Sequence, residues 1–327
     1  MKFSKLSLMV MFIMTIVWGS SSLSWFSMWM ALEMNTMMFM PLMWMGSFQQ
    51  HSESVMKYFL IQGISSMMFI GLALSLNMPI YFQLSNYIYV IMFITIMLKI
   101  GMFPFMFWYV EVIVKCTFLS MKMILTIQKF LPMMMMSYIF YELKLTWLYI
   151  FIIVNAILGA ISALNQTGLK KIISFSSITQ MSWMVMSIYM GFSLYLIYFF
   201  VYSLIVIYLC SFISNNMIYL FLDLLMIKNM FFSLNILSLA GLPPFSGFVI
   251  KWLVFDFMII NGYYLLGFFL IMSSLITLYF YLRLMFVVPI MSMVNLKFFN
   301  YIYSNIFLKI MGIMNLVVIP FMLIIYL

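Results

Sequence analysis

Apolar runs long enough to cross a lipid bilayer follow one another along almost the whole chain, and this feature constrains the fold most. Because a helix needs roughly 20 apolar residues to cross about 30 Å of hydrocarbon, each run predicts a transmembrane helix. Hydrophobic residues make up 68% of the chain and charged residues only 6%, so a water-soluble surface cannot be built. The sequence therefore predicts an all-α, polytopic membrane protein.

Polar residues, glycines and prolines divide the apolar runs into about eleven predicted transmembrane helices. The predicted spans are 5–20, 23–46, 55–77, 86–106, 119–140, 147–165, 172–190, 193–214, 229–261 (broken), 263–283 and 304–326. The first is expected to be one span among many rather than a cleaved signal peptide. We expect a single transmembrane domain over 1–327, with repeats at about 5–140 and 147–285 and a C-terminal helix at about 304–326.

The basic residues predict the orientation of these helices. There are 15 Lys and Arg against 6 Asp and Glu, and the basic residues are spread along the chain rather than clustered as a nucleic-acid surface requires. Only Lys144 falls on the side opposite the N-terminus, so the N-terminus is predicted to lie inside. On the N-terminal side fall Lys2, Lys5, Lys57, Lys115, Lys122, Lys170, Lys171, Lys228, Arg283, Lys297 and Lys309.

Few side chains are available for metal, redox or nucleophilic chemistry. Cys116 and Cys210 are the only cysteines, and His51, expected in a loop, is the only histidine. These counts argue against disulfide scaffolds, zinc sites, haem ligation and Cys/His catalysis. The abundance of Met (41), Phe (36) and Tyr (21) is typical of an AT-rich, mitochondrially coded chain.

Four ionisable side chains lie near the middle of their predicted spans, namely Glu33, Lys99, Lys129 and Lys251. A charge at the centre of a membrane helix costs at least about 2.5 kcal/mol, so these groups must face protein, pair with one another or meet water. Burial weakens the hold of a lysine on its proton, which makes a buried lysine suited to a proton relay. The alternative is a structural ion pair between Lys99 and Glu33, with the other two lysines extended toward the membrane surface or hydrogen-bonded to carbonyls.

Two copies of the pattern Gly-x-x-Pro-Phe fall inside predicted spans, at 101–105 just after Lys99 and at 241–245 just before Lys251. Proline frees a backbone carbonyl, which hydrocarbon tolerates only where the carbonyl meets protein or water. We therefore expect two broken helices, on spans that run in opposite directions as in inverted repeats. Simple kinks for packing are the alternative. The residues of the breaks are Gly101, Pro104, Gly241, Pro243 and Pro244.

Other charged residues are secondary candidates. Glu111 with Lys115, and Glu53 with Lys57, are spaced for i,i+4 contacts of the kind found on helix surfaces, worth a few tenths of a kcal/mol. Two more residues are expected first to anchor the inner face and second to contribute to a proton entrance, namely Lys170 and Lys171.

Six segments match one family in order and spacing. They are "LEMN" at 32–35, "SVMKYFLIQ" at 54–62, "LKIGMFPFMFWYVEV" at 98–112, "IQKFLP" at 127–132, "LNQTGLKKIISFSSITQMSW" at 164–183 and "LSLAGLPPFSGFVIKW" at 237–252. In these segments the chain resembles the antiporter-like, proton-pumping subunits of NADH:ubiquinone oxidoreductase (complex I), subunit 2 of the mitochondrial enzyme in particular.

The resemblance implies roles for the mid-span residues. Glu33 resembles the carboxylate that pairs with the broken-helix lysine, here Lys99. Lys129 resembles the central-axis lysine, and Lys251 the terminal lysine of the second half-channel. In the mechanism proposed for the family, quinone chemistry elsewhere changes the field along this axis, and protons move from the matrix to the intermembrane space.

The resemblance also implies a setting. It places the chain in the mitochondrial inner membrane with its N-terminus on the matrix side. It implies the small subunit 4L and the antiporter-like subunit 4 as neighbours, and membrane lipid such as cardiolipin, with no nucleic acid. It implies no redox cofactor in this chain, because NADH, FMN, iron-sulfur clusters and ubiquinone belong to other subunits.

Two of these segments depart from the family pattern. The family often has histidine where this chain has Met106 and Gln180, and "SSIxHMGW" also differs at Ser182. A relay through those histidines would need water in their place, because neither methionine nor glutamine titrates. Two other functions remain open, namely a free-standing cation/proton antiporter and a structural membrane scaffold without transport.

Overall fold

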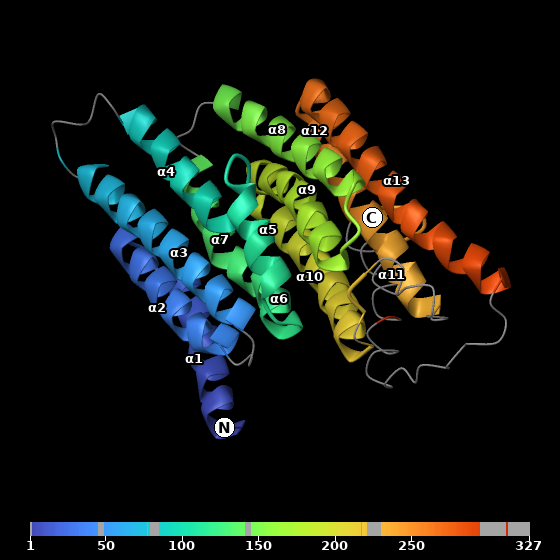
Figure 1. Cartoon of the computed structure of the whole chain (residues 1–327). Helices are drawn as coiled ribbons and strands as arrows, with labels where there is room; N and C mark the ends of the chain where they lie inside the picture. Colours follow the sequence, from blue (N-terminus) through green and yellow to red (C-terminus); the bar gives the residue numbers. More distant parts are fainter. Residues whose placement is uncertain are drawn as a thin grey trace. The chain divides into compact units, whose positions relative to one another are not determined.

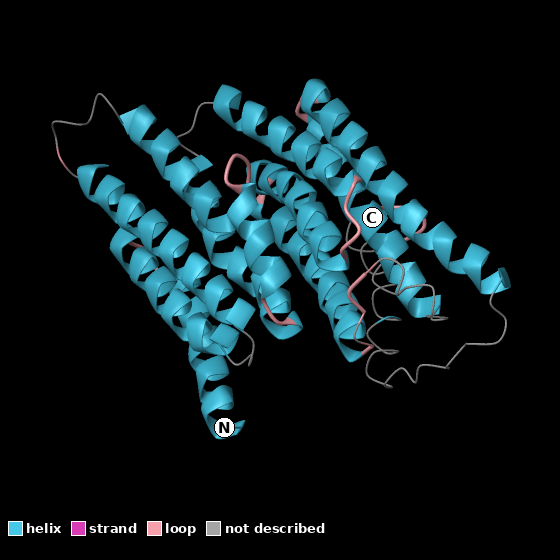
Figure 2. Cartoon of the chain, in the orientation of Figure 1, coloured by secondary structure: helices cyan, strands magenta, loops and turns pink. Residues whose placement is uncertain are grey.

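The computed structural model describes residues 2–44, 49–76, 78, 85–140, 145–216, 218–220, 230–294 and 312. Over these residues the secondary structure is helical, apart from one isolated antiparallel bridge between Gly168 and Leu220 (Figure 2). The chain divides into two compact units, Met1–Phe151 and Ile152–Leu327. Figure 1 labels the helices in chain order. The prediction of an all-α fold is confirmed.

In the first unit the helices pack mainly against their neighbours in the chain, and α3 also contacts α5 while α7 contacts α1 and α4. A Pro inside α2, Pro41, leaves that helix continuous. The buried residues of α4 and α7 are mostly apolar, but they include Lys99 and Lys129. The helices are α1 (Lys2–Ser21), α2 (Trp25–Trp44), α3 (Gln49–Leu76), α4 (Ser85–Ile100), α5 (Met106–Lys115), α6 (Phe118–Leu125) and α7 (Ile127–Phe140).

In the second unit, α9 is buried along almost its whole length, from Ile172 to Ile188. It packs against α10, α12 and α13. Its hydroxyl groups, such as that of Ser176, donate to carbonyls of the preceding turn, which satisfies them without a partner helix. The helices are α9 (Leu169–Met190), α10 (Phe192–Asn215), α11 (Met230–Ala240), α12 (Ser246–Ile260) and α13 (Tyr264–Val294), with α8 (Leu145–Leu164) running from the first unit into the second.

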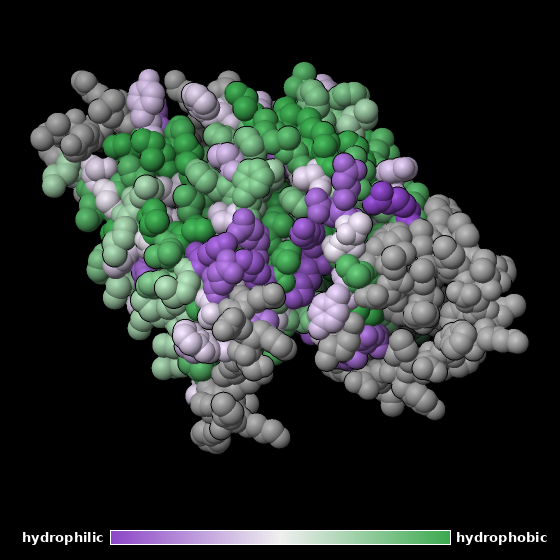
Figure 3. Space-filling view, in the orientation of Figure 1, coloured by the Kyte–Doolittle hydropathy of each residue, from purple (hydrophilic) through white to green (hydrophobic). Residues whose placement is uncertain are grey.

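Five stretches of the described helices are long and apolar enough to cross a membrane: His51–Leu76, Phe118–Phe140, Trp147–Leu164, Phe192–Asn215 and Tyr264–Met285. Hydrophobic side chains cover much of the visible surface of the described part (Figure 3). Leu60, Met67 and Leu265 are each more than half exposed, at 55%, 67% and 68%. Exposed apolar side chains on long apolar helices fit a lipid environment.

Some predictions fall on residues that the structure does not describe. Apart from residue 312, the predicted C-terminal helix 304–326 lies outside the described residues. The same holds for the side chains of Lys2, Lys5, Lys144, Lys228, Lys297 and Lys309. The number of eleven spans and the orientation of the N-terminus therefore stay predictions.

Candidate functional site

The first Gly-x-x-Pro-Phe pattern breaks a helix, as predicted. α4 ends at Ile100, and Gly101 follows with φ +79°, in the left-handed region that favours glycine. The N–H groups of Gly101 and Met102 both donate to the carbonyl of Met97, at 2.9 and 3.1 Å. These bonds form a left-handed C-terminal cap of the Schellman type. After Pro104 and Phe105 the chain enters α5 at Met106.

The second pattern has the same local structure. α11 ends at Ala240, and Gly241 follows with φ +85°. The N–H groups of Gly241 and Leu242 donate to the carbonyl of Leu237, at 3.1 and 3.3 Å. The Phe103–Pro104 and Pro243–Pro244 peptide bonds are both cis. The matched pattern in the sequence therefore corresponds to two matched helix breaks.

Lys251 reaches across the second break. Its side chain projects from α12 and is 7% exposed, and its Nζ donates to the carbonyl oxygen of Ala240, the last residue of α11, at 3.2 Å. A Cβ atom at Gly241 would lie 2.8 Å from this Nζ, so the glycine makes room for the ammonium group. The C-terminal end of a helix carries partial negative charge, which favours a cation there.

Lys99 lies before the first break, in the last turn of α4, and is 5% exposed. Its Nζ makes no hydrogen bond to the described residues. It lines a cavity of about 20 Å³, which is enough for a water molecule. The cavity is polar on several sides, because it is also lined by Thr36, Tyr58, Gln62, Trp108, Gln128 and Lys129.

Lys129 lines the same cavity and is 2% exposed. Its Nζ lies over the ring of Tyr109, 5.1 Å from the ring centre, which is a cation–π arrangement. A Cβ at Gly101 would lie 2.5 Å from the Cβ of Tyr109. The first break therefore lets Tyr109 pack closely against the chain at the position where its ring faces Lys129.

A third helix interruption was not predicted. The predicted span 119–140 is divided at Thr126, whose φ and ψ are −118° and −85°, between α6 and α7. The hydroxyl of Thr126 donates to the carbonyl of Lys122 at 2.7 Å, and the N–H of Lys129 donates to the carbonyl of Thr126 at 3.0 Å. Lys129 therefore also lies within one turn of a break.

Glu33 lies on α2 in the same unit as Lys99, with one carboxylate oxygen buried and without a hydrogen-bond partner among the described residues. The two side chains interact electrostatically but do not form an ion pair. The direct ion pair that the family resemblance implies is therefore absent from the structure, and a role of the two residues in proton translocation stays a prediction.

Gln180 lies beside the second break. Its Nε2 donates to the carbonyl of Leu239 in α11 at 3.3 Å, and its Oε1 accepts a short hydrogen bond from the hydroxyl of Tyr198 in α10. The side chain is 4% exposed. Gln62 occupies a similar place at the first break, because its Nε2 donates to the carbonyl of Lys99 at 2.9 Å. Sequence reasoning identified neither Tyr198 nor Gln62 as a site residue.

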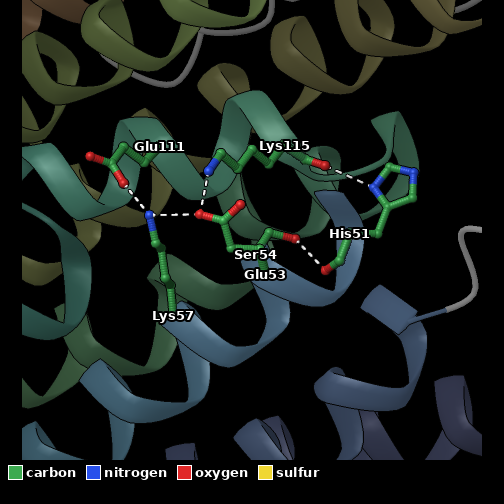
Figure 4. Close-up of polar contacts among 6 residues, drawn as sticks. All are labelled: His51, Glu53, Ser54, Lys57, Glu111 and Lys115. Atoms are coloured by element: carbon green, nitrogen blue, oxygen red, sulfur yellow. Dashed lines mark hydrogen bonds and ion pairs between the residues drawn. The ribbon is translucent and has the colours of Figure 1, made fainter. Parts of the chain in front are cut away.

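Among the secondary candidates, the expected contact between Glu111 and Lys115 does not form. Lys57 pairs with Glu53 at 3.0 Å and with Glu111 at 2.6 Å, and Lys115 pairs with Glu53, so the network joins α3 to α5 (Figure 4). Because α3 and α5 pack together, each residue finds a partner across the helices. The four side chains are 30–55% exposed, so the network lies away from the buried lysines.

The remaining residues singled out in the sequence do not line the cavity that Lys99 and Lys129 share. His51 is in the first turn of α3 rather than in a loop, and its Nδ1 lies 2.7 Å from the carbonyl oxygen of Lys115. Lys170 and Lys171 lie in the first turn of α9, about 15 Å along the helix from Gln180 at 1.5 Å per residue. Met106 is the first residue of α5.

Comparison with known proteins identifies relatives over most of the chain. Residues 22–277 match the family described as NADH:quinone oxidoreductase/Mrp antiporter, TM. NADH-ubiquinone oxidoreductase chain 2 of Anopheles gambiae is 33% identical over 293 residues, which is 84% of this chain and 83% of that protein. The chain 2 protein of Locusta migratoria is 31% identical, over 87% of this chain and 86% of that protein.

Solved structures share the fold. Respiratory complex I from Thermus thermophilus with bound aureothin contains a chain with a TM-score of 0.82 and 20% sequence identity, covering 97% of this chain and 77% of that chain. A chain of the membrane-bound sulfane sulfur reductase, an archaeal respiratory membrane complex, has a TM-score of 0.82 and 14% identity, covering 96% of this chain and 72% of that chain. By its sequence match to the family and its identity to the chain 2 proteins, the chain belongs to the NADH:quinone oxidoreductase/Mrp antiporter transmembrane family, among the relatives known as NADH-ubiquinone oxidoreductase chain 2.

Proposed function

We propose that this chain is a proton-translocating membrane-arm subunit of NADH:ubiquinone oxidoreductase. The observation that carries this proposal is the pair of matched helix breaks with a buried lysine beside each, Lys99 at the first and Lys251 at the second. Among the described residues, the ammonium group of Lys251 bonds to a backbone carbonyl and pairs with no carboxylate that would fix its charge. It can therefore lose and regain its proton when the local field changes, which a structural ion pair resists.

The first unit supports the same function through two lysines on one cavity. Lys99 and Lys129 both line it, and two like charges facing a small space disfavour each other. Protonation of one lysine then promotes release from the other, so a proton can be passed on through cavity water. In the proposal Glu33 supplies the negative charge that holds a proton on Lys99.

The proposed setting is the mitochondrial inner membrane, with the N-terminus on the matrix side. Electron transfer from NADH to ubiquinone in other subunits, which hold FMN and the iron-sulfur clusters, drives protons through this chain toward the intermembrane space. The excess of Lys and Arg on the predicted N-terminal side over the opposite side supports this orientation. Subunits 4L and 4 and anionic lipid such as cardiolipin are the proposed neighbours, and the two matched breaks support two inverted repeats.

The test is Lys251→Met in the assembled complex. Methionine keeps the size of the side chain but carries no proton, so we expect both proton pumping and NADH oxidation to fall, because they are coupled. Lys122→Met, at the end of α6, is the matched control. Equal pumping in both variants, with normal assembly, would count against the proposal.

The alternative function, a free-standing cation/proton antiporter, is distinguished by measuring cation/proton exchange by the isolated chain. Such a protein would exchange cations for protons after purification away from other subunits and without NADH. The coverage of 83–86% of the chain 2 relatives favours the subunit instead. Exchange by the isolated chain would reverse this preference.

A further inference from the structure

The two helix breaks share a contact that the backbone pattern does not require. In each break, the carbonyl two residues before the glycine accepts a hydrogen bond from a buried glutamine on another helix. Gln62 of α3 donates to the carbonyl of Lys99, and Gln180 of α9 donates to that of Leu239. The glutamines are 7% and 4% exposed.

A helix that ends inside a protein leaves its last four carbonyls without helical partners. At the end of α11 each of these carbonyls has a donor in the structure. The carbonyl of Leu237 accepts from Gly241 and Leu242, that of Ser238 from Gly241, that of Leu239 from Gln180 and that of Ala240 from Lys251. Gln180 and Lys251 therefore bond to adjacent carbonyls.

Tyr198 holds the other end of the Gln180 amide. Its hydroxyl donates to the Oε1 of Gln180, which leaves Nε2, the donor end, directed at Leu239. An ammonium group has three donors. Without Gln180, Lys251 would find a second free carbonyl one residue from the one it already bonds.

We infer that Gln62 and Gln180 are positioning residues for the proton-carrying lysines. Gln180 donates a hydrogen bond to the carbonyl oxygen of Leu239, so Lys251 bonds to the carbonyl oxygen of Ala240 instead. Gln62 holds the carbonyl of Lys99 itself, which fixes the end of α4 from which this lysine faces the cavity. The inference rests on the proposed proton translocation and adds the residues that hold its carriers in place.

The test compares Gln180→Leu with Gln180→His and with Asn155→Leu in assembled complex. Histidine restores an N–H donor. Asn155 is the matched control, because it is a fully buried amide of the same unit that donates to a carbonyl, that of Ile178, at 2.8 Å, away from the break. The measured quantities are the maximal rate and the KM of NADH-driven proton pumping, per assembled complex.

We expect Gln180→Leu to lower the maximal rate about tenfold, the size of effect that one lost hydrogen bond to a buried group produces, with the KM for NADH unchanged. Gln180→His should recover most of the rate, and Asn155→Leu should retain it. A rate for Gln180→Leu equal to that of Asn155→Leu, or no recovery with histidine, would overturn the inference.

Two further variants separate the possible failures. Tyr198→Phe removes only the hydroxyl that anchors the Oε1 of Gln180, so it keeps the packing. We expect its rate to fall as well, and a full rate would overturn the inference even if Gln180→Leu does not assemble. Lys251→Met is measured beside them. Retained pumping in Lys251→Met refutes the proposed function, whereas its loss together with a normal Gln180→Leu refutes only the positioning role.

Discussion

Replacing Gly241 by alanine should impair pumping more than it impairs the fold. The residue has φ +85°, and a side chain in this region costs about 1–2 kcal/mol. The new Cβ would lie 2.8 Å from the Nζ of Lys251 and 3.3 Å from its Cδ. Because the ammonium is the far end of a flexible side chain, it can move aside, and it then leaves the carbonyl of Ala240.

The magnitude follows from the bond that is lost. A hydrogen bond to a charged group is worth about 1.5–3 kcal/mol, so the population of Lys251 in its native position should fall about 10- to 100-fold. The matched control is Gly262→Ala, because Gly262 has φ +79° with no atom within 4 Å of its ideal Cβ. It carries the same backbone cost without touching a lysine.

The assay measures thermal stability of the assembled complex and the rate of NADH-driven pumping per complex. Both variants should lower stability by a similar amount, but only Gly241→Ala should lose at least tenfold in rate. Equal rates in the two variants would refute the reasoning that the glycine makes room for the ammonium.

Two other substitutions test separate features. Glu33→Gln should lower proton-coupled activity of the assembled complex, because it removes a carboxylate that interacts with Lys99, and normal pumping would count against its role. Gly247→Ala should prevent assembly or lower the thermal stability strongly, because its Cβ would lie 1.7 Å from the backbone oxygen of Ser238. The control is Gly63→Ala, which should be tolerated because no atom lies within 4 Å of the ideal Cβ at that position. Blue native electrophoresis measures the assembly of the two glycine variants.

The sequence predicted the helix breaks where glycine and proline occur together, because Gly101 and Gly241 both take the left-handed backbone that ends a helix. Proline alone was less informative. α2 continues through Pro41, whereas the predicted span 119–140 is interrupted at Thr126, six residues before Pro132. Which prolines accompany a break depends on the groups available to satisfy the freed backbone, and these come from other helices.

Contacts between helices explain the remaining differences. Spacing of four residues suggested that Glu111 pairs with Lys115, but both find partners on α3. Neither Gln62 nor Tyr198 is charged or lies in a Gly-x-x-Pro-Phe pattern, so their role at the breaks depends on packing alone. The candidate lysines could be identified because an isolated charge in an apolar run is costly wherever the run packs.

The two lysines lie on opposite sides of their breaks, Lys99 on the helix before the first break and Lys251 on the helix after the second. Lys99 belongs to the helix that ends at its break, so it moves with α4 whatever α5 does. Lys251 belongs to the helix that begins after the break and is bonded to the helix before it. Lys251 therefore links α12 to α11 by a hydrogen bond. A shift of α12 along α11 by about the length of one hydrogen bond, roughly 3 Å, would break this bond. A displacement of α12 along α11 would therefore change the surroundings of the charged group at the second break, whereas a displacement of α5 would leave Lys99 on α4.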